Sequence, residues 1–234
     1  MIDVLGLIET IFPSRCAACG GIVKELGLCR ECMASIDPVE SHCLGCGLPL
    51  NTGFFEFCGN CIDKRLHFDE IWVLYPYRKV SKLILDFKLN RSLKAKKAIE
   101  ALINKSLPSR EKVYSFKGID VITFVPIDWK KAFKREFNQS EEIARIMGKM
   151  TEKPVKPLLK KVKATRDQTE LSPAERAANV KGAFKALSEA KGKTILIVDD
   201  VATTLNTLNH CGLALKKEKA KKVIAFSFSR ATHV

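Results

Sequence analysis

The sequence predicts an α/β protein, in which a mostly parallel sheet carries helices on both faces and follows a small cysteine-rich module. Two observations predict this organisation. After residue 66, short apolar runs alternate with segments whose apolar residues recur at helical spacing, and strands separated by helices imply a parallel sheet covered on both sides. Before that point, eight of the nine cysteines form four Cys-x-x-Cys pairs. We therefore divide the 234 residues into two domains, 1–66 and 67–234.

The first twelve residues, MIDVLGLIETIF, place apolar side chains as an amphipathic helix does. We expect this helix to pack on the body of the protein, and docking on a membrane or a partner is the alternative. Asp3, Glu9 and the lack of a basic start argue against a signal peptide, and no apolar run is long enough to span a bilayer. We therefore expect a cytoplasmic protein, with association with a membrane as the alternative.

The four cysteine pairs predict two structural zinc sites. Each pair suits a tight knuckle that presents two thiolates to one metal, and two knuckles complete a tetrahedral site of four cysteines. A disulfide framework would call for a secretory signal, which this sequence does not show. Sequential pairing of the knuckles and a cross-braced arrangement both stay open, and His42 and His67 are expected to be bystanders. The predicted ligands are Cys16, Cys19, Cys29, Cys32, Cys43, Cys46, Cys58 and Cys61.

The larger domain continues as an alternation of strands and helices. A helix from Asn138 opens with the pattern Asn138-x-x-Glu141, which is typical of a capping box. The charged stretch of residues 160–180 is either a lid over a phosphorylated ligand or a solvated connection. Cys211 is expected to be a buried small hydrophobe. Strands are expected at residues 71–77, 119–125, near 155–159, 194–198 and 222–227, and helices at 80–89, 93–107, from Asn138 and from about 204 to 217.

The run ILIVDDVATT, residues 195–204, is the strongest indication of a binding site. An apolar strand ends in two carboxylates, Asp199 and Asp200, and small residues with Thr203 and Thr204 then lead into a helix. Ligands of α/β sheets bind beyond the carboxyl ends of the strands, and the N–H groups of a turn and a helix N-terminus bind anions. Two carboxylates beside such a site can hold the vicinal hydroxyls of a sugar. The pattern therefore predicts a ribose 5-phosphate site, and Asp residues in an ordinary loop are the alternative.

The net charge of +14 is unevenly distributed along the chain. Residues 1–66 contain five basic and eight acidic residues, whereas residues 67–234 contain 35 and 18. Such an excess attracts polyanions, because contacts of Lys and Arg with phosphates dominate the affinity for nucleic acids. A lysine-rich surface that serves solubility or stability at high temperature is the alternative. Lysines cluster at 94–97, 130–135, 160–166 and 216–222.

The segment VDDVATT resembles the ribose-phosphate motif of the type I phosphoribosyltransferases. Leu205 stands where those proteins usually have Gly, and a turn with positive φ would be unfavourable for Leu. The resemblance extends to a narrower group, the ComF family of competence-associated, phosphoribosyltransferase-like proteins. It is carried by the cysteine module, YRKVSKLILDFK, VPIDWKKAFKREFNQS, QTELSPAERAANVKGAF, VDDVATT and FSFSRA, which together extend over nearly the whole chain.

This resemblance implies a type I phosphoribosyltransferase fold behind a zinc ribbon, and a role in handling single-stranded DNA during natural transformation. It implies that Asp199 and Asp200 form the catalytic pair and hold the ribose hydroxyls of 5-phosphoribosyl 1-pyrophosphate (PRPP), with Mg²⁺ bridging pyrophosphate and ribose oxygens. A DNA-uptake channel in the membrane and a translocating ATPase are the implied partners. The remaining implied ligand contacts are Thr203, Thr204 and Thr207 for the 5-phosphate, Lys131 in the loop 126–131 for pyrophosphate, and Lys88 for a further phosphate.

Two functions from different classes stay open. The first is a DNA-handling protein that binds PRPP or a terminal nucleotide phosphate and stacks bases on aromatic residues such as Trp129, Phe133 and Phe137. The spacing of the last two also suits ordinary core packing. The second is a Mg²⁺-dependent transferase that moves ribose 5-phosphate from PRPP to a base or an amine. The sequence identifies no acceptor and no general base, so it leaves enzymatic transfer open.

Overall fold

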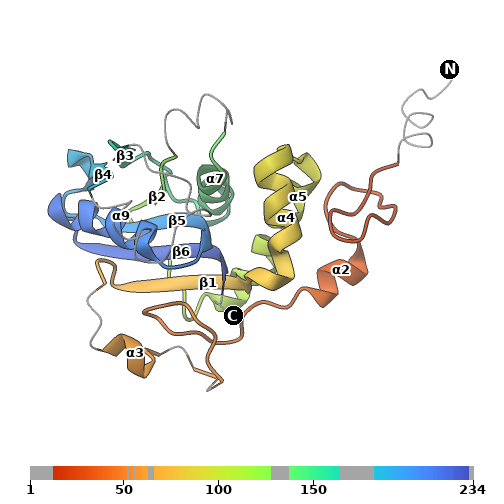
Figure 1. The fold of residues 1–234 in the computed structure, drawn as a ribbon, viewed down its shortest axis with the longest axis horizontal. Coiled ribbons are helices and arrows are strands. Elements are labelled where there is room, and N and C mark those ends of the chain that lie inside the picture. Colours follow the sequence, from red (N-terminus) through yellow and green to blue (C-terminus); the bar gives the residue numbers. More distant parts are fainter. Residues whose placement is uncertain are drawn as a thin grey trace.

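In a computed structural model of the chain, the structure describes residues 13–51, 53–54, 56–62, 66–127, 137–163 and 182–231 (Figure 1). At its centre is a parallel sheet in the strand order β1-β6-β5-β2. A two-stranded antiparallel sheet, β3-β4, lies beside it. The strands are β1 (Glu70–Pro76), β2 (Val121–Phe124), β3 (Leu159–Lys161), β4 (Phe184–Ala186), β5 (Thr194–Ala202) and β6 (Lys222–Arg230).

Helices cover both faces of the parallel sheet, which confirms the predicted fold class. Helices α4 (Tyr77–Asn90), α5 (Leu93–Ser106) and α7 (Gln139–Thr151) lie on one face, and α9 (Asn206–Lys217) lies on the other with the β3-β4 sheet. None of the helices in the described part of the chain is long and apolar enough to cross a membrane. The short elements are α2 (Arg30–Ser35), α3 (Gly59–Ile62) and the 3-10 turns η1 (Pro108–Arg110) and η3 (Ser188–Ala190).

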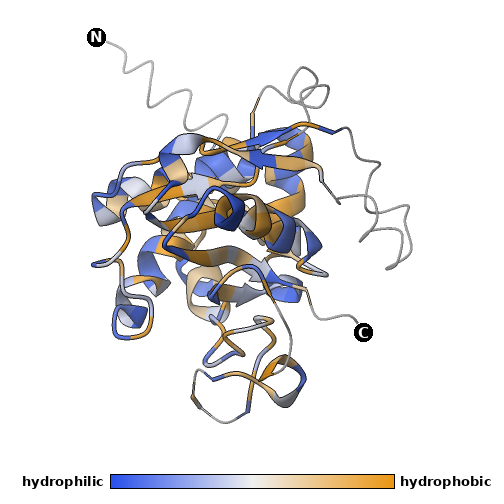
Figure 2. Cartoon of the chain, turned by 90° about the vertical axis from the view of Figure 1, so that its left-hand side faces the viewer, coloured by the Kyte–Doolittle hydropathy of each residue, from blue (hydrophilic) through white to orange (hydrophobic). Residues whose placement is uncertain are grey.

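Neighbouring residues of each central strand face two different hydrophobic cores. Leu196 and Val198 of β5 pack on the side of α4, α5 and α7, whereas Ile195 and Ile197 pack on the side of α9. This alternation follows from the two-residue period of a strand. Because both faces are covered, the strands are apolar along most of their length, and Figure 2 shows them as hydrophobic ribbons between helices of mixed colour.

The two cysteine segments contact the sheet domain at different places. In the second segment, Cys46 belongs to the same core as Val73 of β1, and the N–H of Ile71 donates to the carbonyl of Leu44 at 2.7 Å. The first segment lies beside α4, where the Lys82 ammonium donates to the carbonyl of Ala18 at 2.7 Å. Both segments are therefore joined to the α/β domain by direct contacts.

Most predicted elements are present, and local differences include the strand near 155–159 and the start of α7. The strand predicted near 155–159 is an isolated bridge between Val155 and Ile122, followed by β3. Asn138 caps α7 by accepting the N–H of Ser140, but Glu141 pairs with an arginine one turn along the helix. The predicted N-terminal helix lies outside the described residues, as does most of the charged stretch 160–180.

Candidate functional site

The acidic pair lies inside strand β5 and not in the turn after it. The sequence predicts a strand that ends at Val198, but β5 continues to Ala202 because β6 continues to Arg230 and pairs with the additional residues. Asp199 lies opposite Ser227 in this extension. The two carboxylates are still near the carboxyl end of a central strand, which is where α/β sheets bind ligands.

Asp199 is held at the start of α7. Its side chain is 9% exposed, and its Oδ1 accepts the Ser140 hydroxyl and the N–H of Asp200, each at 3.0 Å. Burial raises the pKa of Asp199 well above its usual value, the charge of Asp200 raises it further, and the bond from Ser140 acts in the opposite direction. A carboxyl in this position gains most when a ligand hydroxyl or a cation stabilises its charged form.

The turn between β5 and α9 has the backbone conformation that a glycine would favour. Leu205 has φ 65° and ψ −3°, although the sequence predicts that a positive φ there is unfavourable for Leu. The side chain is only 6% exposed and belongs to the core under α9. Burial of a leucine gives about 1.5–3 kcal/mol, which offsets the 1–2 kcal/mol of a left-handed residue. The predicted penalty is therefore present but compensated by packing.

Three threonines surround this turn. Thr203 and Thr204 are half-buried in the turn itself, and Thr207 lies in the first turn of α9, which begins at Asn206. The first N–H groups of a helix have no acceptor within the helix, so they attract an anion. The structure thus brings Asp199, Asp200 and the three threonines together at one edge of the sheet.

The start of α7 completes this edge, where sequence reasoning identifies Asn138 as a helix cap but does not single out Gln139 or Ser140 as site residues. The Asn138 side-chain amide donates to the carbonyl of Val125 at 2.9 Å and so ties α7 to the end of β2. Gln139 is 4% exposed, and its amide nitrogen has no hydrogen-bond partner among the described residues. The capping pattern locates this helix start, but only the fold brings Ser140 to Asp199, 59 residues along the chain.

Lys88 lies in the last turn of α4, on the side of the sheet that also carries α7. Its neighbour Phe87 has its ring centre 5.2 Å from that of Phe137, which precedes α7. This contact agrees with core packing of Phe137. The described contacts do not link Lys88 to Asp199 or Asp200, so its predicted phosphate contact stays a prediction.

Several predicted site residues lie outside the described residues. They include Lys131 with the greater part of its loop, the aromatic residues Trp129 and Phe133, and the QTELSPAERAANVK part of the charged stretch. Their predicted roles in binding pyrophosphate, stacking bases and covering the ligand therefore stay predictions.

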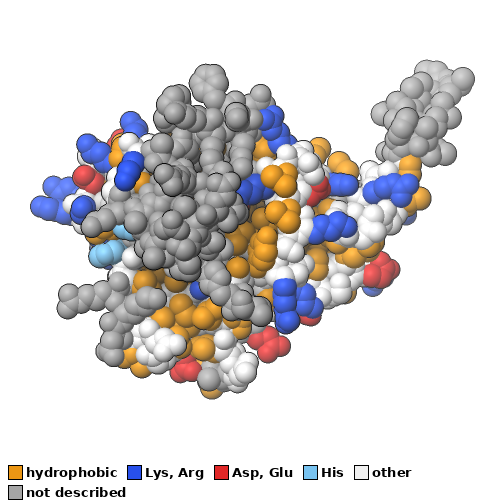
Figure 3. All heavy atoms as spheres, viewed as in Figure 1, with side chains coloured by type: hydrophobic (Ala, Val, Ile, Leu, Met, Phe, Trp, Pro, Cys, Tyr) orange, Lys and Arg blue, Asp and Glu red, His pale blue; other side chains and the backbone are white. Residues whose placement is uncertain are grey.

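Two of the lysine clusters lie on opposite faces of the sheet. The cluster 94–97 is in the first turn of α5, and the cluster 216–222 joins the end of α9 to the start of β6. Parts of both clusters form ion pairs, as Lys97 does with Glu100 at 3.0 Å and Lys216 with Asp69 at 2.8 Å. Figure 3 accordingly shows Lys and Arg side chains spread over the two sides of the viewed face.

The cysteines form two separate groups in sequential order. Within each group the four Sγ atoms lie within 4.8 Å of one another. Tetrahedral zinc with Zn–S bonds of about 2.3 Å spaces its sulfur ligands about 3.8 Å apart. The observed distances between Sγ atoms are 3.8 Å for Cys19 and Cys29 and 3.9 Å for Cys46 and Cys58, so both groups fit structural zinc. The groups are Cys16, Cys19, Cys29 and Cys32, and Cys43, Cys46, Cys58 and Cys61.

Backbone N–H groups prepare one thiol in each group for metal binding. Burial acts to raise the pKa of Cys43, but three backbone N–H bonds lower it to about 7. The same balance lowers the pKa of Cys16 to about 6. His42 is not part of either group: it is buried, and its Nε2 lies 2.9 Å from the carbonyl oxygen of Ile71. Bound zinc would supply cross-links in a segment with little apolar core of its own.

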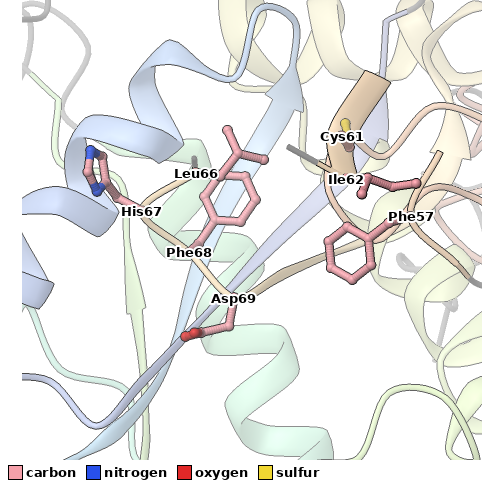
Figure 4. Close-up of a pocket in the computed structure, with 7 residues that line it drawn as sticks. All are labelled: Phe57, Cys61, Ile62, Leu66, His67, Phe68 and Asp69. Atoms are coloured by element: carbon pink, nitrogen blue, oxygen red, sulfur yellow. The ribbon is translucent and has the colours of Figure 1, made fainter. Parts of the chain in front are cut away.

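A pocket of about 530 Å³ lies beside the second cysteine group (Figure 4). It is lined mainly by apolar side chains, and Phe68 and Asp69 in its wall immediately precede β1. It therefore opens at the amino edge of the parallel sheet, away from the carboxyl edge that carries the acidic pair. The lining residues are Phe57, Cys61, Ile62, Leu66, His67, Phe68 and Asp69.

Comparison with known proteins gives similarity along nearly the whole chain. A family model described as Double zinc ribbon domain matches residues 7–62, and one described as Phosphoribosyl transferase domain matches residues 139–231. Competence protein F of Haemophilus influenzae is 26% identical over 227 residues, which cover 94% of this chain and 98% of that protein. DNA utilization protein YhgH of Escherichia coli is 25% identical over 206 residues, which cover 87% and 90%.

These matches coincide with the structural features described above. The zinc-ribbon match includes both cysteine groups, and the transferase match begins at α7 and ends after β6, so it includes Ser140, the acidic pair and the turn at Leu205. The parallel sheet has the helices on both faces that a type I phosphoribosyltransferase-like fold requires. The two domain matches and the two relatives together support the predicted assignment of the chain to the ComF family of competence-associated, phosphoribosyltransferase-like proteins.

Proposed function

We propose that the protein binds a phosphorylated ribose, with PRPP as the reference ligand, at the carboxyl end of β5. The proposal depends on one observation: two carboxylates and a left-handed turn that opens a helix follow one another within residues 199–207. Asp199 and Asp200 would accept the vicinal hydroxyls of the sugar. Thr203, Thr204 and Thr207, with the N–H groups at the start of α9, would hold the 5-phosphate.

The conformation of Leu205 supports this proposal. If Leu205 had a right-handed helical conformation where a Gly is expected, the N–H groups of this segment would point away from a bound anion. Leu205 instead has a positive φ, and its side chain is buried in the core and not in the solvent beside the turn. Mg²⁺ is the cation we expect with PRPP, because it prefers oxygen ligands and keeps several waters.

Calorimetric titration with PRPP and Mg²⁺ tests the site. We expect the double variant Asp199→Asn/Asp200→Asn to lose binding by at least about 100-fold, since several charge-assisted hydrogen bonds of about 1.5–3 kcal/mol each are removed. Asp37→Asn is the matched control, because this carboxylate is 73% exposed and remote in sequence. Equal affinity of the wild type and the double variant would exclude this site.

We further propose that the protein handles single-stranded DNA in a competent cell. The excess of basic residues after residue 66 and the printed names of the relatives, a competence protein and a DNA utilization protein, support this role. Binding of a labelled oligonucleotide should weaken steeply with salt and depend little on sequence. An affinity that does not change between low and moderate salt would exclude contact with the DNA backbone.

Charge reversal on the two faces tests where the DNA lies. The double variant Lys94→Glu/Lys97→Glu changes the α5 face, and Lys217→Glu/Lys221→Glu changes the end of α9. Only the variant on the face that contacts DNA should bind DNA with a weaker salt dependence. Its slope of log affinity against log salt should fall by about one for each phosphate contact that is lost. Competition by PRPP would place the 5′ end of the strand in the ribose-phosphate site.

The second candidate is a Mg²⁺-dependent phosphoribosyltransferase, and the left-handed turn at Leu205 favours it because Leu adopts there the positive φ that a Gly would favour. In this reaction the bond between the anomeric carbon and pyrophosphate breaks, and the base or amine acceptor forms the new bond. Asp199→Asn or Asp200→Asn should abolish pyrophosphate release. If pyrophosphate were released only at the background rate with every base and amine acceptor, transfer would be excluded, whereas the proposed ligand binding would still stand.

A further inference from the structure

The last residue of β6, Arg230, connects the second cysteine group to the turn that follows β5. Its guanidinium is buried, with the residue only 6% exposed. The Nε donates to the carbonyl of Cys46 at 2.7 Å, and Nη1 donates to the carbonyl of Ala202 at 3.0 Å and to the carbonyl of Thr203. A buried charge requires such partners, so the guanidinium and the three carbonyl groups hold one another in place.

The packing around this arginine leaves little freedom between the two sites. Gly47, which follows the ligand Cys46, has φ 70°, and a Cβ added to it would lie 2.7 Å from the Val73 Cγ2 and 3.4 Å from the Arg230 Cδ. The knuckle backbone is thus in direct contact with β1 and with the arginine stem. Displacement of Cys46 would have to move the guanidinium, because tightly packed interiors transmit such shifts.

The other end of this connection is part of the proposed ligand site. Arg230 lies opposite Ala202 in the parallel sheet, so both strands end together at the carboxyl edge. Thr203, whose carbonyl accepts from the guanidinium, is the first threonine of the turn that would hold the 5-phosphate. Arg230 is therefore a positioning residue, which acts on the ligand through the backbone of the turn.

We propose that Arg230 couples the second zinc site, formed by Cys43, Cys46, Cys58 and Cys61, to the ribose-phosphate turn, so that occupation of either site stabilises the other. This inference rests on the proposed ribose-phosphate function. Coupling between two sites is reciprocal and commonly reaches about 5–150-fold. PRPP should therefore raise the affinity of the second site for zinc by about fivefold or more, which is expected to be measured as slower zinc release, and loss of that zinc should weaken PRPP binding by the same factor.

The first zinc site provides an internal control. In the described part of the chain, its segment contacts α4 and α5: Lys82 donates to the carbonyl of Ala18, and Lys105 of α5 donates to the carbonyl of Met33 at 2.6 Å. Ala17 belongs to the core on the opposite side of the sheet from Leu205. PRPP should leave the release of zinc from this first site unchanged.

The experiment measures zinc release from the full-length, zinc-loaded protein to a chromogenic chelator, with and without saturating PRPP. Cys19→Ser, which removes an exposed ligand of the first site, assigns the two release phases. The variant Asp199→Asn/Asp200→Asn shows whether PRPP acts through its site or by binding zinc directly. Arg230→Lys, which keeps the charge but loses the planar fork, should abolish the effect of PRPP, whereas Arg145→Lys on the exposed side of α7 should not.

Three outcomes decide the inference. Selective slowing of the second phase that requires Arg230 supports it. Calorimetric binding of PRPP without any change in the second phase overturns the coupling and leaves the proposed function standing. Absence of PRPP binding overturns both. If Arg230→Lys does not fold, the wild-type comparison of the two phases still decides, because it needs no change in the arginine.

Discussion

Replacement of Leu205 separates the two opposing effects at the phosphate turn. This residue combines a left-handed backbone with a side chain that is only 6% exposed. Leu205→Ala keeps the backbone strain and removes the packing, so it should lower the free energy of unfolding by about 2–5 kcal/mol. Leu205→Gly removes the same packing and also relieves about 1 kcal/mol of strain. We therefore expect the Gly variant to be about 1 kcal/mol more stable than the Ala variant.

Leu208 in the first turn of α9 is the matched control. It is 1% exposed and belongs to the same core, but it has a helical backbone. Leu208→Ala should therefore lower the stability by a similar amount. Leu208→Gly should lower it by a further 0.5–1 kcal/mol or so, because glycine is unfavourable within a helix. The difference between the Gly and Ala variants should thus change sign between Leu205 and Leu208.

Urea denaturation of the zinc-loaded protein, followed by circular dichroism, measures this difference. The midpoints should shift while the dependence on urea stays constant, which indicates unchanged compactness of both states. A Leu205→Gly variant that is less stable than Leu205→Ala would refute the reasoning, since the left-handed backbone would then carry no strain. PRPP affinity of the Gly variant should stay within about threefold of the wild type, because the turn keeps its shape.

Three further perturbations test the site and its surroundings. The raised pKa of Asp199 means that its contribution to stability is present below the unfolded pKa near 4 and is lost as the pH rises through the folded pKa. Asp199→Asn should therefore gain thermal stability over the wild type as the pH rises above about 4, and a gain that is constant with pH would contradict this. Ser140→Ala removes the bond that lowers this pKa, so the pH profile of PRPP binding should move to higher pH. Gly212→Ala would place a Cβ 2.4 Å from the carbonyl oxygen of His67 and should cost about 1–3 kcal/mol in urea denaturation, whereas Gly118→Ala, with no atom within 4 Å, should change little.

The sequence predicts those helices and strands whose apolar residues recur at a regular spacing. The apolar spacing after Leu93 predicts a helix over 93–107, and the structure has α5 at Leu93–Ser106. The ends of β5 and β6 cannot be predicted from this spacing, because the apolar pattern stops at polar residues such as Asp199. In the sheet those polar residues pair across the two strands, as Asp199 does with Ser227, and this pairing depends on a partner distant in sequence.

Some residues of the two sites can likewise be predicted from local sequence patterns, and others cannot. The eight zinc ligands are recognised from the three-residue spacing of the cysteines, and the acidic pair from its place after an apolar strand, but only the structure shows which cysteine pairs form one group. Ser140 and Arg230 have no such local signal. Their contacts with Asp199 and Cys46 join residues 59 and 184 positions apart, so they exist only once the sheet has formed.

The unfavourable features of the fold concentrate where the ligand is proposed to bind. Among the described residues, the non-glycine residues with positive φ are Leu205, Arg91, Glu152 and Lys219. The last three are exposed and follow the ends of helices, where a left-handed residue is common. Leu205 instead precedes a helix, six positions after a buried carboxyl with a raised pKa. Each feature alone lowers the stability; packing of Leu205 compensates the first, and the hydroxyl of Ser140 acts against the second. A ligand with hydroxyls for the carboxylates and a phosphate for the turn would stabilise both, which explains why a sequence retains them side by side.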